Sequence, residues 1–266
     1  MKWFEIGLVV LTIASGIIWL LDRMVFARRR AERAGLLEPK EPVVVDYARA
    51  FFPVLAVVLV LRSFVAEPFR IPSSSMMPSL LVGDFILVNK FAYGLRLPVV
   101  NRKFIETGHP ERGDVVVFRP PHHPDQDWIK RVIGLPGDRV AYRDNTVWVN
   151  DEPFDYRYVG RYVGEGQGRE MSGANLLVEA LPGRPHPVLE RDGPRFFSPQ
   201  GAGEWVVPAG HYFVMGDNRD NSEDSRFWQA HFLPESNLRG KAFLVWMHWD
   251  GSAGGVDFDR IGSGIP

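Results

Sequence analysis

The first part of the chain is dominated by a long apolar segment. Residues from Trp3 to Leu21 are almost wholly apolar, apart from Glu5 near the outer end of the segment. About 19 residues at ~1.5 Å per residue make a helix of roughly 28 Å, close to the thickness of a bilayer's hydrocarbon core. A cleaved signal peptide usually has a shorter apolar core, of ~7–15 residues, after a more basic start. We therefore expect residues 1–22 to form a retained transmembrane helix.

A second apolar run covers Phe51 to Leu61 and can be extended from about Tyr47 to Val65. Its short core is ambiguous between a membrane span and a buried helix, and Arg62 interrupts its end. An arginine near a helix end is compatible with a span, because its long side chain can reach the membrane interface. We expect residues 47–66 to form a second transmembrane helix.

The segment between the two apolar runs is basic. Five arginines follow the first run directly: Arg23, Arg28, Arg29, Arg30 and Arg33. An excess of basic residues marks the cytoplasmic side of a membrane protein. Residues 23–46 are therefore predicted to be a cytoplasmic loop, with the N-terminus outside. If both runs cross the membrane, residues 67–266 lie outside the cytoplasm.

From Gly83 onward the pattern changes to short apolar runs that alternate with turn residues. Six runs are typical of strands: Asp84–Asn89, Asp114–Phe118, Thr146–Asn150, Trp205–Val207, His211–Met215 and Lys241–Met247. Residues 151–203 contain many Gly, Pro and Arg residues and only weak strand signals. We expect 67–266 to be a mainly antiparallel all-β domain, with 141–204 as a smaller β subdomain or insertion. The fold class is thus N-terminal transmembrane helices followed by an all-β domain.

Composition excludes several classes of function. The 31 basic and 32 acidic residues of the 266-residue chain leave a net charge of −1, so no global field attracts nucleic acid. Cysteine is absent, which excludes disulfides, thiolate chemistry and cysteine-containing metal sites. The chain also lacks the H-E-x-x-H pattern of zinc proteases.

Three serines lie between Pro72 and Pro78, just after the second apolar run. The prolines restrict the backbone to extended conformations and make a helix interior unfavourable here. A hydroxyl on a stiff loop suits a serine nucleophile, which needs a nearby base to take its proton. Taken alone, the stretch Phe69–Leu80 also fits a serine-rich linker behind a membrane anchor, because Ser-Pro clusters are common in linkers.

The base is not obvious among the seven histidines, because none has a carboxylate pattern that indicates a triad. The S-x-x-K pattern also fails, since Pro78 is the third residue after Ser75. Lys130 lies in the apolar run Trp128–Asp138, where alternation puts Lys130 and Arg131 on opposite faces of a strand. Burial would lower the pKa of such a lysine enough for it to act as a base. The ordinary alternative is that both residues are exposed strand charges.

A dense polar cluster, Gly216–Trp228, follows the strand that ends at Met215. A calcium loop that starts at Asp220 is excluded, because Ser225 and His231 occupy the positions that require Gly and Glu. The cluster fits either a generic polar turn or a loop that orients a catalytic amine by hydrogen bonds.

Four motifs occur in order behind the two apolar segments: Pro72–Pro78, Arg112–Phe118, Ile129–Asp138 and Gly216–Ser222. Together they closely resemble type I signal peptidase (leader peptidase). The resemblance implies a Ser–Lys dyad, with Ser75 as the nucleophile and Lys130 as the general base. Ser73 matches the residue whose hydroxyl forms the oxyanion hole with the backbone N–H of Ser75. Ser74 mainly spaces these two serines and stands where many relatives carry glycine.

Further roles follow from the same resemblance. Ser222 matches the serine that positions the lysine amine, and Asp224 and Arg226 match a supporting ion pair. The expected substrate pocket, which admits small side chains, is lined by Phe69, Ile71, Pro72, Met76, Leu80 and Ile129. No metal and no organic cofactor is expected. The role of 151–203 and the oligomeric state stay open.

The implied activity is a membrane-bound serine endopeptidase that removes N-terminal signal peptides from exported preproteins after a small-x-small motif. Its expected location is the inner or plasma membrane, with the catalytic domain on the extracytoplasmic, periplasmic side. The expected partners are preproteins and the phospholipid bilayer, and not nucleic acid. Two alternatives remain. One is another Ser–Lys peptidase, such as a self-cleaving repressor, although those proteins do not begin with membrane helices. The other is a non-enzymatic, membrane-tethered β module that binds secreted proteins.

Overall fold

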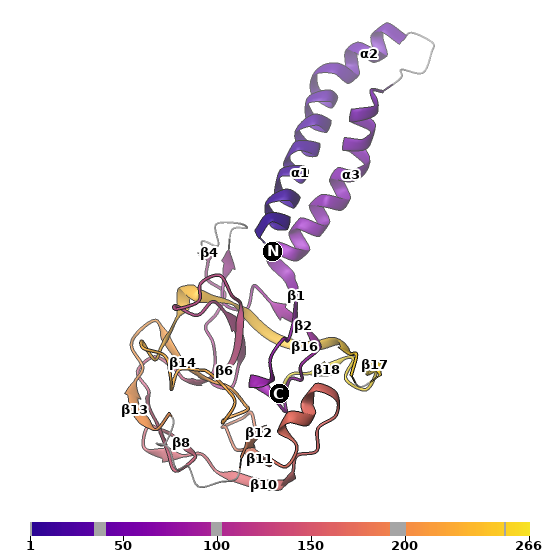
Figure 1. The fold of residues 1–266 in the computed structure, drawn as a ribbon. Helices are drawn as coiled ribbons and strands as arrows, with labels where there is room; N and C mark the ends of the chain where they lie inside the picture. The colour runs from indigo at the N-terminus through magenta and orange to yellow at the C-terminus, as the bar shows by residue number, and fades with distance from the viewer. Residues whose placement is uncertain (1, 35–40, 97–102, 192–200, 253) are drawn as a thin grey trace. The chain divides into compact units, whose positions relative to one another are not determined.

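The computed structural model describes residues 2–34, 41–96, 103–191, 201–252 and 254–266 (Figure 1). The chain divides into two compact units. The first comprises residues 1–66 and 94–106, and the second comprises residues 67–93 and 107–266.

The first unit contains the two apolar segments as helices. Helix α1 spans Lys2–Leu21 and continues through a wider helical turn, Asp22–Phe26, into the basic α2, Ala27–Ala34. Helix α3 spans Val43–Val60 and ends in a similar turn, Leu61–Val65. The unit also holds a two-stranded ribbon of β3 (Leu95–Arg96) and β4 (Lys103–Ile105).

Both helical segments, Ile6–Arg30 and Val43–Ser63, are long and apolar enough to cross a membrane. Their most apolar 18-residue windows have mean hydropathies of 1.9 and 2.1. Their apolar side chains are largely exposed, with Leu11 at 59% and Val54 at 60%. An apolar surface of this kind is unfavourable in water and favourable in lipid. Helix α3 begins before the predicted Tyr47, at Val43, because Pro42 caps it in an extended conformation.

Helices α1 and α3 pack against each other around a glycine. A Cβ atom at Gly16 would lie 2.7 Å from the Phe52 ring, so only glycine allows this approach. The Phe52 ring in turn lies 5.6 Å from the Trp19 ring. Small residues that let helices approach closely are a common means of packing in membranes.

The second unit is built on a large antiparallel sheet, which confirms the predicted fold class (Figure 1). The strand order is β1-β2-β16-β5-β6-β14-β15, with two short strands, β17 and β18, paired to β16. Their bounds are β1 Ala66–Arg70, β2 Asp84–Asn89, β5 Val115–Phe118, β6 Trp128–Gly134, β14 His211–Met215, β15 Leu233–Pro234, β16 Leu238–Asp250, β17 Gly255–Val256 and β18 Ser263–Gly264.

Strand β6 lies between β5 and β14, and both of its faces are buried. Lys130 pairs with Val116 of β5, while Arg131 pairs with Met215 of β14. Lys130 is 4% exposed and Arg131 is fully buried, although they point to opposite faces. The alternative of two exposed strand charges is therefore wrong, because other parts of the unit cover both sides of this central strand.

Two smaller sheets follow β6 in sequence. One has the order β13-β7-β8-β9, and the other has the order β10-β11-β12. Their bounds are β7 Arg139–Arg143, β8 Thr146–Val149, β9 Glu152–Pro153, β10 Tyr156–Arg161, β11 Asn175–Glu179, β12 His186–Glu190 and β13 Gly203–Val206. The four-stranded sheet extends past both ends of the predicted 141–204 segment. The three-stranded sheet, β10–β12, is called the insertion sheet below.

Candidate active site

The serine loop, residues 71–80, connects β1 to β2 and is anchored by its apolar side chains. Met76 and Leu80 are fully buried, and Ile71 is 2% exposed. Backbone hydrogen bonds close the loop at its base, where Gly83 N donates to Ile71 O at 3.0 Å. A single tight turn, Ser74–Met76, presents Ser75 with its side chain almost enclosed. Burial of the apolar residues of the motif thus fixes the position of Ser75.

The structure brings Ser75 and Lys130 together, although 55 positions separate them in sequence. Lys130 Nζ donates to Ser75 Oγ at 2.6 Å. The Ser73 and Ser75 hydroxyl oxygens lie 3.4 Å apart. Trp128 lies on the same face of β6 as Lys130, with its ring centroid 5.7 Å from Nζ. A nucleophile within hydrogen-bond distance of an amine base is the arrangement that covalent catalysis requires.

Burial sets the charge state of the amine. Desolvation of Lys130 lowers its pKa to about 8, against the opposing effect of the Asp224 and Asp217 carboxylates. A lower pKa means that a larger share of the amine is neutral near neutral pH. The neutral amine has the lone pair that a general base needs, so the buried strand position makes this lysine suitable for that role.

The polar cluster Gly216–Trp228 lies against both members of the dyad. The Ser222 hydroxyl donates to Asp224 Oδ2 at 2.9 Å, which leaves its own lone pairs to accept from an amine. Asp224 forms a bidentate ion pair with Arg226, at 2.9 Å for each contact. Burial raises the pKa of Asp224, but the Arg226 guanidinium holds it below its usual value. The carboxylate is therefore charged beside Lys130.

Gly216 allows this cluster to approach the serine loop. A Cβ atom at Gly216 would lie 2.2 Å from Ser222 Oγ and 2.5 Å from the Ser75 carbonyl oxygen. Any larger residue would therefore push Ser222 away from the Ser75 backbone.

Two asparagines that were not predicted join the cluster to the serine loop. The Asn218 backbone N–H donates to Ser75 O at 3.1 Å, and its side-chain Nδ2 donates to Ser74 O at 3.0 Å. Asn221 Nδ2 donates to Ser74 Oγ at 2.8 Å. Ser74 therefore does more than space its neighbours. The asparagines of the cluster are visible in the sequence and could have suggested hydrogen bonds. The direction in which their side chains point is not visible there.

The predicted pocket residues lie mainly in one buried cluster. Ile71, Met76, Leu80 and Ile129 belong to it, and Phe69 packs against it while half-buried. Pro72, by contrast, is exposed beside Ser73. The four buried side chains form the apolar floor beneath Ser75.

Comparison with known proteins places the chain in a family. The profile described as "Signal peptidase, peptidase S26" matches residues 44–249. Signal peptidase I of Pseudomonas fluorescens is 45% identical, with 92% of each chain covered. Signal peptidase I of Pseudomonas aeruginosa is 46% identical over the same shares. A solved signal peptidase I from Enterococcus faecalis matches 51% of this chain and 98% of its own, at 25% identity and a TM-score of 0.30. The chain therefore belongs to the signal peptidase family, peptidase S26, and is a hydrolase.

Proposed function

We propose that this chain uses Ser75 and Lys130 to remove signal peptides from exported preproteins, cutting after a small-x-small motif. The observation that carries the proposal is the 2.6 Å hydrogen bond between Lys130 Nζ and Ser75 Oγ, at a site that buries both side chains. Family membership supports the substrate class, since the relatives are signal peptidases.

In the first step, neutral Lys130 takes the proton of Ser75 as its oxygen attacks the scissile carbonyl. The Ser75 backbone N–H and the Ser73 hydroxyl stabilise the developing oxyanion. Each such donor contributes roughly 3–4 kcal/mol in comparable sites. The 3.4 Å between the Ser73 and Ser75 hydroxyl oxygens keeps the second donor close to the reacting centre.

In the second step, the Lys130 ammonium protonates the leaving amine, and the C–N bond breaks to give an acyl-enzyme. Lys130 is then neutral again and takes a proton from the water that hydrolyses the ester, and it returns this proton to Ser75 Oγ as the ester bond breaks. Ser222 orients the amine through its lone pairs, because its own hydroxyl proton is directed at Asp224. Phe69, Ile71, Pro72, Met76, Leu80 and Ile129 shape the pocket for small side chains.

The proposed setting is a bilayer that both helical segments cross, with the basic residues 23–33 in the cytoplasm and the catalytic unit on the periplasmic side. The serine loop begins at Ile71, soon after the apolar segment that ends at Val65. A nucleophile at this position in the chain meets its substrate where the apolar part of a signal peptide ends.

The test is cleavage of a reporter preprotein by the purified full-length chain in detergent. Ser75→Ala and Lys130→Met should lose activity by at least about 1,000-fold, because each removes a reacting group. Lys130→Arg should be equally inactive, since arginine stays protonated. Exposed Ser236→Ala is the matched control. Near-normal turnover by any of the three active-site variants would overturn the proposal, and so would failure of an acylating inhibitor to label Ser75.

A further inference from the structure

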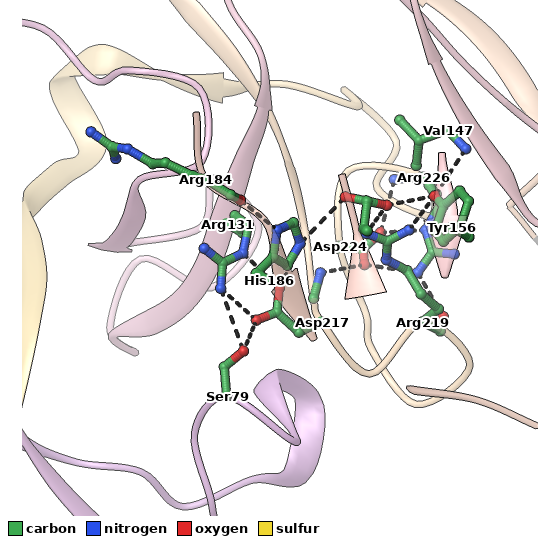
Figure 2. A network of polar contacts seen from close by, with 12 residues as sticks. Ser79, Arg131, Val147, Tyr156, Arg184, His186, Asp217, Arg219, Asp224 and Arg226 are labelled. Carbon is green, nitrogen blue, oxygen red and sulfur yellow. Dashed lines mark hydrogen bonds and ion pairs between the residues drawn. The ribbon is translucent and has the colours of Figure 1, made fainter. Parts of the chain in front are cut away.

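A buried ionic cluster joins the insertion sheet and β6 to the segment Gly216–Trp228, which is called the polar loop below. It comprises Arg131, Tyr156, Glu179, His186, Asp217 and Arg219, and Figure 2 labels all of these except Glu179. The four groups that form its two ion pairs, Arg131 with Asp217 and Arg219 with Glu179, have side chains at most 1% exposed. Burial of this many charges is costly unless every one is paired, so the geometry is tightly specified.

Glu179, the last residue of β11, is the centre of one half. Its Oε2 accepts from Tyr156 Oη at 2.5 Å and lies 2.6 Å from Arg219 Nη2. Its Oε1 lies 3.3 Å from His186 Nε2. Burial raises the pKa of Glu179, but Arg219 and His186 bring it down to about 2, so the carboxylate is charged. Glu179 and His186 come from the insertion sheet, whereas Arg219 comes from the polar loop.

Asp217 is the centre of the other half, next to the dyad. Arg131, the neighbour of Lys130, donates to it from Nε at 2.9 Å and from Nη2 at 2.7 Å. Ser79 of the serine loop donates to Asp217 Oδ2 at 2.5 Å. His186 Nε2 lies 3.8 Å from Asp217 Oδ1 and so stands between the two carboxylates (Figure 2).

The insertion sheet also binds the polar loop through backbone atoms. Leu189 N donates to Asp217 O at 2.9 Å, and Arg219 N donates to Leu189 O at 3.0 Å. These bonds pair Leu189 of β12 with Asn218 in parallel, as a further strand would. Asn218 is the residue that holds the carbonyl oxygens of Ser74 and Ser75. The insertion sheet is thus linked to Ser75 through one residue, Asn218.

We propose that Glu179 is a positioning residue for the dyad: by pairing with Arg219 it fixes the polar loop against the serine loop, and this is the role of the insertion sheet. A buried guanidinium is destabilising unless a carboxylate pairs with it, so Arg219 must stay beside Glu179. The loop from Gly216 to Ser222 is then held in the position that encloses Lys130. The inference rests on the proposed function, because the dyad is what the loop positions.

The test compares Glu179→Gln with the wild type, using the full-length chain in detergent and a reporter preprotein. We expect kcat to fall about ten-fold or more while KM stays within about two-fold, because the reacting groups and the substrate contacts remain. The acid limb of the pH–rate profile should follow the pKa of Lys130, which burial lowers to about 8 in the wild type. In the variant this limb should move to higher pH, because water that enters beside Lys130 reduces its desolvation.

A charge-balanced variant, Glu179→Gln/Arg219→Gln, covers the case in which the single variant fails to fold. It leaves no buried charge unpaired and removes the constraint on the loop, so the same fall in kcat and the same shift are expected. Hydrogen exchange at the Asn218 amide, which donates to Ser75 O, should become faster in either variant.

Val188→Ala is the matched control, since Val188 is a fully buried apolar residue of β12 in the same insertion sheet. It should lower the Tm without moving the acid limb. A folded Glu179 variant with wild-type kcat and pH profile would overturn the inference, and so would an equal shift in Val188→Ala. These outcomes are distinct from failure of the proposed function, which is decided by activity of Ser75→Ala and Lys130→Met.

Discussion

At the scale of single residues, burial gives Lys130, the proposed general base, its lowered pKa. Lys130 is 4% exposed on a central strand, and desolvation brings its pKa from 10.5 to about 8. The same desolvation that favours the neutral, basic form destabilises the folded protein whenever the amine is protonated. Activity and stability therefore oppose each other at this one side chain, as is common at active sites.

Lys130→Met should abolish cleavage and stabilise the fold at pH 7. Because the folded pKa of Lys130 is about 8 and lies below its usual 10.5, the penalty is fully present below pH 8. It declines as the pH rises to 10.5, where the unfolded chain also loses the proton. A shift of this size corresponds to about 3 kcal/mol.

Denaturant unfolding of both proteins in the same detergent, at pH 7 and at pH 10, measures this difference. The stability advantage of Lys130→Met should be largest at pH 7 and should shrink at pH 10. An advantage that is independent of pH would show that the buried charge is not its source.

At the scale of elements, two loops from distant parts of the chain form the site on a rigid sheet. The serine loop is fixed by apolar burial, and the polar loop is fixed to it by hydrogen bonds from Asn218 and Asn221. Much of this was predictable: the strand His211–Met215 was predicted with the bounds that the structure has, and the dyad residues followed from motif resemblance. Both depend on local patterns.

The pairings between distant segments could not be predicted from the sequence. The strands of the insertion sheet had weak signals, because β10 is mostly exposed and its side chains do not alternate clearly. The burial of Arg131 depends on its pairing with Asp217, which is 86 positions further along the chain. A charged residue is read as exposed until its partner is known, so such clusters become visible only in three dimensions.

Gly216→Ala tests how the two loops meet. Its methyl group would lie 2.2 Å from Ser222 Oγ and 2.5 Å from Ser75 O, so the polar loop must move away from the dyad. We expect kcat to fall about 100-fold, because small misplacements of this kind are costly. Gly251→Ala is the control: it also removes a glycine, and nothing lies within 4 Å of the added atom. Equal activity of the two variants would contradict a close approach at Gly216.

At the scale of the whole molecule, the chain joins a pair of apolar helices to a β catalytic unit. The helices expose apolar side chains along their length, and α1 is followed by the arginines of residues 23–30. A basic flank is typical of the cytoplasmic side of a membrane protein, so the proposed orientation of the chain rests on the first unit. In that proposed orientation, the catalytic unit follows the second span on the opposite side of the membrane.

Single cysteines can test this orientation directly, because the natural sequence contains none. Ser236→Cys in the catalytic unit should react with a membrane-impermeant maleimide in intact spheroplasts. Arg29→Cys in α2 should react only after the membrane is opened. The two sites are both exposed, so accessibility within the protein is matched. Labelling of Arg29→Cys in intact spheroplasts would reverse the proposed topology.

The pairing of Glu179 with Arg219 has a consequence for how the sequence can change over generations. Exposed positions of β10 can drift one at a time, since each side chain faces solvent. Glu179 and Arg219 cannot be substituted one at a time, because either substitution alone leaves the partner's charge buried and unpaired. Neutral substitutions in the insertion sheet are therefore confined to its exposed positions. Any lineage that abandons this ion pair must replace both residues together, in effect as one inherited unit.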